Sequence, residues 1–218
     1  MEIDESARRV KEFEGDSLTN RLSELEYLFQ GLTGQDATSL CDEHGLNSQL
    51  LDAAYQIKAL AGQIHVVIHA AGILTSLPTI LEEGEEVESL SLGAGNTGRQ
   101  FDLETNLRVA EFKFIHWKGG PESIRQNSLF KDFFELAEAD TNKRKYLYVL
   151  GLTQPLKFFH GRRSLSSVMS RNAALAQSFF TKYDDSFSVV SDYFETKKNE
   201  VAIVDLTPMV PALAGIDE

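Results

Sequence analysis

Hydrophobic residues in the first third of the chain recur with helical spacing. Ser17 can cap a helix, and Gly31 and Gly34 can end one. The apolar residues between these signals lie three or four positions apart, as they do on one face of a helix. They are Leu18, Leu22, Leu25 and Phe29. A first helix is therefore predicted between Ser17 and Gly31.

A longer helix is predicted from about residue 48 to residue 75. Pro78 and Gly84 are expected to close it, because proline disrupts a helix interior and glycine favours its end. The apolar stripe of this segment is broad enough for a helix that packs in the core. The stripe consists of Leu50, Ala53, Ile57, Leu60, Ile64, Val67, Ala71 and Leu74.

The hydrophobic pattern then changes to one typical of β-strands. Residues 87–92, 100–105 and 108–117 are predicted to form three strands. The glycine-rich sequence GAGNTG, at residues 93–98, joins the first of them to the second. Residues 145–152 form a continuous apolar run that is short enough for a buried strand.

Two helices and a last strand complete the pattern. Pro121 suits the first turn of a helix that precedes the buried strand, a further helix is predicted at residues 164–181, and a last strand at residues 201–206. The order helix, three strands, helix, strand predicts an α/β fold with a central mixed sheet flanked by helices. The apolar face of the helix after Pro121 carries Phe130, Phe133, Phe134 and Ala137.

Length and charge narrow the class of partner. A chain of 218 residues suits one domain and leaves ample sequence for a buried core. Its net charge is −12, from 33 acidic and 21 basic side chains. Residues 1–95 carry 17 acidic and 5 basic groups, whereas residues 99–171 carry 13 basic and 8 acidic groups. An anionic partner is therefore expected to meet the middle segment.

Cysteine content and hydropathy exclude further classes. A single cysteine, Cys41, rules out a disulfide framework and a cysteine-based zinc finger. The most apolar stretch, residues 59–81, is interrupted by polar residues such as Gln63, His65 and His69, so no membrane span is expected. The first residues are acidic and contain no apolar signal segment, and a cytoplasmic location is expected.

The second and third predicted strands are close enough in sequence to form a hairpin. If Asn106 and Leu107 are the turn residues, Asp102 lies directly opposite Glu111. Lys113 shares their face because side chains alternate along a strand. Three ionisable side chains are then expected to converge, whereas a one-residue change of register would scatter them.

Two directly opposed carboxylates repel each other unless a proton or a cation lies between them. At least one of the two carboxyls is therefore expected to have a raised pKa. Asp102 and Glu111, with the backbone carbonyl of Phe112, would suit a hard ion such as Mg²⁺ or Mn²⁺. Lys113 would help to activate a water whose pKa the ion lowers. These parts suit hydrolysis of a phosphodiester.

Asp102 in RQFDLET, followed by the EFK sequence at residues 111–113, resembles the motif of the PD-(D/E)XK nuclease superfamily. The predicted αβββαβ order also resembles the restriction-endonuclease-like core of that superfamily. The resemblance covers about residues 48–152. It leaves residues 1–47 as an extra N-terminal helical segment and residues 153–218 as a C-terminal helix and strand within one nuclease-like domain.

The resemblance implies a metal-dependent nuclease, an endonuclease acting on DNA, in restriction, phage defence or repair. It assigns metal binding to Asp102 and Glu111 and water activation to Lys113. Many members carry a Gln-x-x-x-Tyr pattern on the helix after the third strand. Here Gln126 is followed by Phe130 at the position of the tyrosine, and Gln126 is expected to support the site. Because nucleases that cut both strands often work as dimers, a homodimer or a partner subunit is a further expectation.

Basic residues in two places are candidates for contacting the DNA backbone, and charged loop ends are an equal alternative. They are Lys143, Arg144, Arg162 and Arg163.

Other interpretations stay open. One is a nuclease-fold module with an inactive site that binds nucleic acid or a partner protein, and another is a module that binds only proteins. An extra metal ligand from Glu86 or Glu88, or a metal between His65 and His69, are weaker alternatives to ordinary surface roles.

Overall fold

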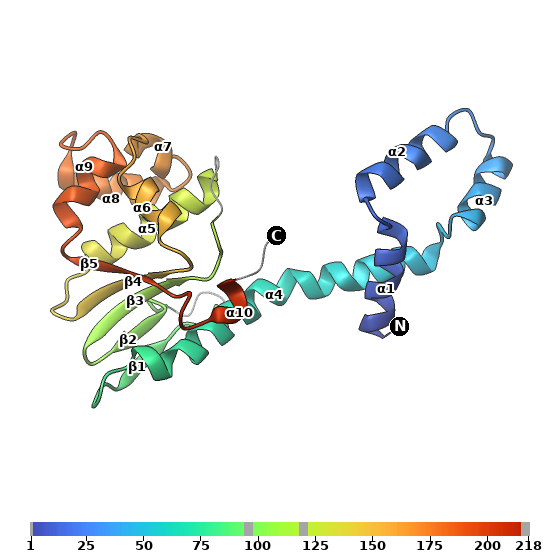
Figure 1. Cartoon of the computed structure of the whole chain (residues 1–218). Coiled ribbons are helices and arrows are strands. Elements are labelled where there is room, and N and C mark those ends of the chain that lie inside the picture. The colour runs from blue at the N-terminus through green and yellow to red at the C-terminus, as the bar shows by residue number, and fades with distance from the viewer. Residues whose placement is uncertain (1, 94–97, 118–121, 215–218) are drawn as a thin grey trace. The chain divides into compact units, whose positions relative to one another are not determined.

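The computed structural model describes residues 2–93, 98–117 and 122–214. The chain divides into two compact units, Met1–His65 and Val66–Glu218 (Figure 1). One helix, α4, contributes its first half to the first unit and its second half to the second.

The first unit is entirely helical in its described residues. It contains α1 (Ile3–Glu14), α2 (Leu18–Leu28), α3 (Gly34–Glu43) and the first half of α4 (Ser48–Ile80). The prediction of α2 is confirmed, whereas α1 and α3 were not predicted because neither carries a long apolar stripe. This unit contains the segment predicted as a helical extension.

Caps explain where these helices begin. The Ser17 hydroxyl accepts a hydrogen bond from the backbone N–H of Asn20 at 3.4 Å, as expected of a helix cap. Gly34, predicted to end a helix, instead begins α3 behind Thr33, whose hydroxyl accepts from the N–H of Asp36. Ser6 of α1 is fully buried.

α4 extends beyond the predicted end and contains Pro78 inside its last turn. The helical hydrogen bonding continues past the proline, since the N–H of Leu81 donates to the carbonyl of Leu77 at 3.0 Å. The second half of α4 packs through Gly72, Ile73, Ser76 and Ile80, which are buried. A Cβ at Gly72 would overlap the ring of Phe114, so only glycine permits this close approach.

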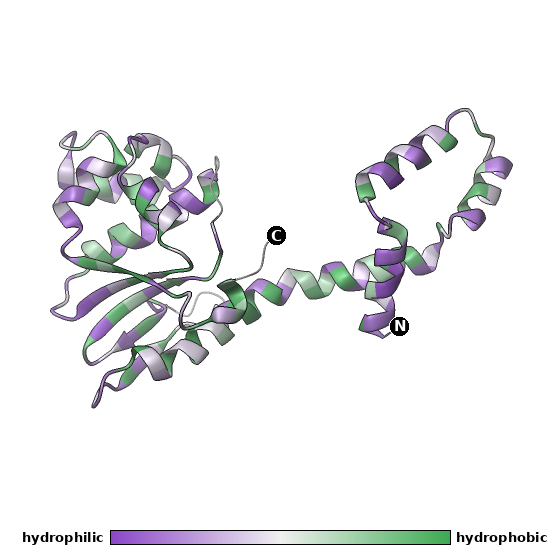
Figure 2. Ribbon diagram, in the orientation of Figure 1, coloured by the Kyte–Doolittle hydropathy of each residue, from purple (hydrophilic) through white to green (hydrophobic). Residues whose placement is uncertain are grey.

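Ala53 of the predicted apolar stripe is buried, but from Leu60 onward the stripe is not the buried face of α4, and the expectation that it packs in the core was wrong there. Leu60, Ile64, Val67 and Leu74 are 54%, 48%, 57% and 47% exposed. Figure 2 shows hydrophobic residues along the whole helix. The spacing could not distinguish the two faces because α4 is apolar on both.

α4 is also the one helix among the described residues that is long and apolar enough to cross a membrane. This finding concerns length and composition alone, and it differs from the expectation that the polar interruptions exclude a span. Only 11% of its most apolar window is buried inside the protein, so the helix does not resemble a buried core helix either.

The second unit is an α/β unit built on a five-stranded open mixed sheet, as the α/β prediction required. The strands lie side by side in chain order, with the first three antiparallel and the last two parallel to the third. They are shorter than predicted and comprise β1 (Val87–Leu90), β2 (Leu103–Thr105), β3 (Arg108–Lys113), β4 (Arg144–Val149) and β5 (Val201–Asp205).

Helices cover both faces of this sheet (Figure 1). One face carries five helices, and the other carries the second half of α4 and the short α10 (Pro211–Ala214). The predicted helix at 164–181 is divided in two, because Asn172 caps a new helix by accepting from the N–H of Leu175 at 3.0 Å. Residues 94–97 of the GAGNTG connection and Pro121 lie outside the described residues. The five helices are α5 (Ser123–Ala137), α6 (Thr153–Phe159), α7 (Leu165–Met169), α8 (Ala173–Tyr183) and α9 (Val190–Lys197).

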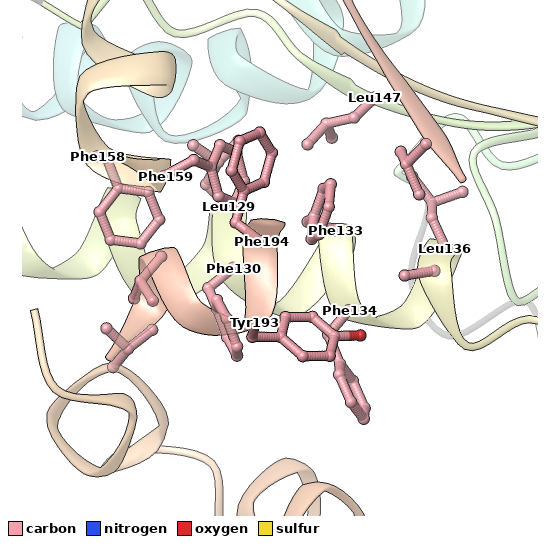
Figure 3. Close-up of a cluster of buried hydrophobic side chains, with 14 of the residues drawn as sticks. Leu129, Phe130, Phe133, Phe134, Leu136, Leu147, Phe158, Phe159, Tyr193 and Phe194 are labelled. Carbon is pink, nitrogen blue, oxygen red and sulfur yellow. The ribbon is translucent and has the colours of Figure 1, made fainter. Parts of the chain in front are cut away.

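The core on the α5 face is dominated by aromatic rings (Figure 3). Phe133 of α5 contacts Phe159 and Phe194, with ring centroids 4.8 and 5.4 Å apart. A smaller core on the opposite face includes Ala110 and Phe112 of β3. Alternation along β3 therefore places Val109, Glu111 and Lys113 on the α5 face.

Candidate functional site

The hairpin between β2 and β3 has the predicted register. Leu103 pairs with Ala110 and Glu104 pairs with Val109. The Thr105 hydroxyl accepts hydrogen bonds from the N–H groups of Leu107 and Arg108 at 3.0 and 2.9 Å, which fixes the turn. The same register brings Asp102, which directly precedes β2, opposite Glu111.

Asp102 is held by two donors. Its Oδ2 accepts the backbone N–H of Phe112 at 3.0 Å, and its Oδ1 lies 3.3 Å from Nε2 of His69 on α4. Burial alone would raise the pKa of Asp102, but the hydrogen bonds from His69 and Phe112 outweigh it and lower that pKa. Asp102 is therefore a carboxylate at neutral pH.

Glu111, in contrast, is protonated at neutral pH. Its side chain is buried on the α5 face of the sheet, with 8% of the residue exposed. Burial raises the pKa of Glu111 to about 9, and the negative charges of Asp132 and Asp102 add to the effect while Lys113 opposes it. A hydrogen bond to Asp102 also favours the protonated form. The two carboxyls thus form a pair that holds one proton, as expected from the register.

Lys113 is bound by a residue that the sequence analysis did not identify. Its Nζ lies 2.5 Å from Oδ2 of Asp132 on α5, a residue that is only 3% exposed. Burial would lower the pKa of Lys113, but the charges of Asp132 and Glu111 outweigh it and raise that pKa. Burial raises the pKa of Asp132, against the opposing effect of Lys113.

A signal for Asp132 is present in the sequence. Asp132 lies three residues after Leu129 and four before Leu136, both of which are buried on the inner face of α5. An acidic residue on an apolar helix face is rarely buried without a partner. This position therefore indicated a buried ion pair, but the sequence pattern did not show that Lys113 of β3, the preceding strand, completes it.

The pair of carboxyls can be tested against the hard ion expected there. No group of three or more His, Cys, Asp or Glu side chains in the described part of the chain is placed to hold a metal. Mg²⁺ commonly uses one or two protein carboxylates and completes its shell with waters and substrate phosphates. Asp102 and Glu111 fit that donor set. Phe112, expected to offer its carbonyl, instead orients Asp102 through its N–H.

The two groups of basic residues differ in their surroundings. Lys143 pairs with Glu88 and Glu104 at 2.6 and 2.8 Å, and Arg144 pairs with Glu82 at 2.6 Å. Arg144 lies opposite Arg108 at the start of β3, five residues before Lys113. These two cations are therefore engaged by acidic residues at the end of the sheet away from the site.

Arg163 lies in a cleft of about 230 Å³ that Trp117 and Gln126 also line. Its guanidinium donates to the side-chain oxygen of Gln126. Gln126, expected to support the metal site, thus contacts Arg163, and the structure shows no contact between Gln126 and the carboxyl pair. Arg162 is exposed and does not line this cleft.

Comparisons of the chain with protein-family models, curated proteins and solved structures returned no match. Functional inference therefore depends on the geometry of the residues themselves.

The glutamates before β1 have structural partners. Glu85 is buried and binds the Arg108 guanidinium through both oxygens, at 2.5 Å each, and the Thr105 hydroxyl at 2.6 Å. Burial would raise the pKa of Glu85, but these bonds lower it to about 2. Glu86 is exposed, while Glu88 binds Lys143. The structure shows neither of these last two beside the carboxyl pair.

The arrangement brings three chemical capacities together at the β2–β3 hairpin. Asp102 supplies a fixed carboxylate, Glu111 a carboxyl that can exchange its proton for a cation, and Lys113 a positive charge held in place by Asp132. A group with a strongly displaced pKa beside charged partners is typical of functional sites, although structural ion pairs can also produce one.

Proposed function

We propose that the protein is a metal-dependent nuclease of the PD-(D/E)XK type, with a restriction-endonuclease-like core in its second unit. The observation that supports this most is the register of the hairpin, which places Asp102 opposite Glu111 with Lys113 on the same face. The order of α4, three antiparallel strands, α5 and a parallel β4 is consistent with such a core.

Each residue has a separate role in the proposed hydrolysis of a DNA phosphodiester. Asp102 and Glu111 bind Mg²⁺ or Mn²⁺, which supplies Lewis-acid activation of water and of the phosphoryl group. Lys113 orients the attacking water and offsets negative charge that develops on the phosphate. Asp132 positions Lys113, and His69 positions Asp102.

Cleavage assays decide between an active nuclease and an inactive binding module. Purified protein is incubated with plasmid, linear DNA, single-stranded DNA and RNA, each with Mg²⁺, Mn²⁺ or EDTA. Glu111→Ala and Lys113→Ala are expected to abolish cutting without loss of fold. Glu104→Gln, on the same hairpin, serves as the matched control. Binding of nucleic acid without metal-dependent cutting would favour the inactive module.

We further propose that the nuclease is a homodimer formed through α4. In the part of α4 that belongs to the second unit, Val67, Ala71 and Leu74 follow one another at spacings of four and three residues, the heptad pattern of a coiled-coil seam. These positions are exposed along the helix. No Asp, Glu, Lys or Arg occurs in the sequence from Leu60 to Leu74, so two copies of this seam would meet without charge repulsion. A second active site in the dimer would suit cutting of both DNA strands.

A further inference from the structure

A cleft opens where β3 and β4 end. It is lined by Trp117, which follows β3, by Gln126 of α5, by Lys157 and Phe158 of α6, and by Arg163. An adjoining cavity of about 330 Å³ shares Trp117 with it and is also lined by His116 and Gly151. Ligands of open α/β sheets commonly bind outside the carboxyl ends of the parallel strands, and this cleft occupies that position.

The indole of Trp117 carries an unusual polar atom. Trp117 is 8% exposed, and its Nε1 is buried without a hydrogen-bond partner in the described part of the chain. Its ring packs near Phe158, with centroids 6.0 Å apart. Buried indole N–H groups usually have an acceptor, and the described part of the chain supplies none here.

The other polar groups of the cleft are also suited to bind a ligand that accepts hydrogen bonds. Lys157 and Arg163 supply positive charge, and no acidic side chain is among its described lining residues. The oxygen of Gln126 is occupied by Arg163, which leaves the amide N–H groups of Gln126 as donors. Arg163 is also anchored within 3.4 Å of the Ser167 hydroxyl. A cavity with donors and two cations fits a compact anion.

The distance from the proposed catalytic residues is short along the chain. Trp117 follows Lys113 by four residues, and Gln126 precedes Asp132 by six residues on α5, which corresponds to about 9 Å along the helix axis. An anion in the cleft would thus lie near the carboxyl pair on the same edge of the sheet.

We propose that this cleft binds a backbone phosphate of the nucleic acid, beside the phosphate that is cut. The proposal rests on the proposed nuclease function, whose site it extends. Arg163 and Lys157 neutralise the phosphate, and Trp117 Nε1 donates a hydrogen bond to one of its oxygens. Because Arg162 does not line this cleft, only one arginine of the pair at residues 162 and 163 is a phosphate ligand.

Trp117 is the only tryptophan of the chain, so its fluorescence reports on this cleft and on the adjoining cavity that it also lines. The full-length protein in EDTA is titrated with a short single-stranded oligothymidine with a 5′-hydroxyl, the same oligomer with a 5′-phosphate, and inorganic phosphate. A saturable change of Trp117 fluorescence with both oligomers indicates that the cleft binds an internal phosphodiester. Change with the 5′-phosphorylated oligomer and inorganic phosphate alone would identify a phosphomonoester site and overturn the backbone assignment.

Variants separate the two arginines. Arg163→Gln is expected to weaken oligomer binding about tenfold and to reduce the salt slope of binding by about one, as loss of one phosphate contact should. Arg162→Gln is the matched control and should bind within about twofold of the wild type. Equal losses in both variants would overturn the proposal. Thermal melts establish that each variant is folded.

Trp117→Phe keeps an aromatic ring and removes the N–H, with binding followed by anisotropy of a labelled oligomer. Weaker binding by this variant supports the indole contact, and unchanged binding contradicts it. Because these measurements are made in EDTA, they do not depend on cutting. Phosphate binding without any Glu111-dependent cleavage would overturn the nuclease function and leave the cleft assigned, whereas cleavage that is indifferent to Arg163 would overturn the cleft alone.

Discussion

Lys113 Nζ lies 2.5 Å from Asp132 Oδ2, and Asp132 is almost completely removed from solvent. This contact joins β3 to α5, the next helix along the chain. A buried charge is costly unless it is paired, so removing either residue leaves the other without its nearest partner. The pair therefore fixes where the Lys113 ammonium stands relative to Glu111, two residues earlier on the same strand.

Asp132→Asn tests whether this contact positions Lys113. The pKa of Glu111 should fall, because the Asp132 charge is one of the causes that raise it, and the pKa of Lys113 should fall with the loss of its partner. Cleavage should drop about 10- to 100-fold, as is typical when a residue that supports a site is lost. Side-chain NMR of Glu111 and Lys113 gives the pKa values independently of activity.

Glu135→Gln is the control for that experiment, because Glu135 lies on the same helix and pairs with Lys131 at 3.0 Å. This variant should leave both pKa values and the cleavage rate close to those of the wild type. Unmoved pKa values in folded Asp132→Asn would show that the pair does not act on Glu111.

Glu111→Gln is expected to stabilise the metal-free protein at neutral pH. The pKa of Glu111 is about 9 in the folded protein and 4.5 in the unfolded chain, so above pH 4.5 the unfolded state binds fewer protons. The folding stability of the wild type therefore falls as pH rises from about 4.5 to about 9, whereas glutamine has no proton to lose. At pH 7 the free energy of unfolding of the variant should exceed that of the wild type by up to about 3 kcal/mol.

Melting curves from pH 5 to pH 9 in EDTA measure this effect. The melting temperatures of wild type and Glu111→Gln should diverge as pH rises, while Glu104→Gln should follow the wild type. Parallel profiles for all three proteins would contradict the raised pKa. Asp102→Asn is not the equivalent test, because the pKa of Asp102 is lowered and its carboxylate contributes favourable bonds to His69 and Phe112.

Much of the hairpin could be predicted from sequence because its constraints are local. The turn at Asn106 and Leu107 sets the register, and the register sets the face of Glu111 and Lys113. Asp132 could not be paired with Lys113 in this way, since nothing local relates the two positions. The sequence also suggested a different role for Lys143, which the sheet brings to Glu88 and Glu104.

The helices also show that local sequence patterns do not predict contacts between distant parts of the chain. Apolar spacing predicted that α4 is a helix, but the buried face was decided by contacts with a sheet formed later in the chain. Gly72 and Ile73 pack there, while Val67 and Leu74 stay exposed. A helix with two apolar faces satisfies the same pattern in either orientation.

Metal binding to the carboxyl pair is expected to release a proton. At pH 7 the folded protein carries a proton on Glu111 that the cation must displace. The affinity for Mg²⁺ or Mn²⁺ should therefore increase about tenfold per pH unit between pH 6 and pH 8. Calorimetric titrations in buffers of different ionisation enthalpy count the released protons. A binding enthalpy that is independent of the buffer would exclude Glu111 as the displaced acid.

Self-association through α4 can be tested by placing charges on its exposed seam. Val67→Glu combined with Leu74→Glu puts a carboxylate at two seam positions, and each would have to be buried next to its counterpart in a dimer. Light scattering after size-exclusion chromatography should show a dimer for the wild type and a monomer for this variant. The monomer should nick plasmid DNA, while the dimer should produce linear DNA directly.

Leu51→Glu is the control, because Leu51 is 72% exposed on the same helix but lies outside the heptad spacing. It should remain a dimer, since its new charge faces water in the proposed assembly. Flotation with lipid vesicles separates the dimer from a membrane-bound helix, which the length of α4 also permits. Wild-type protein that floats with vesicles and loses this property in the double variant would assign the seam to lipid. A wild type that is monomeric and does not float with vesicles would contradict the proposed dimer.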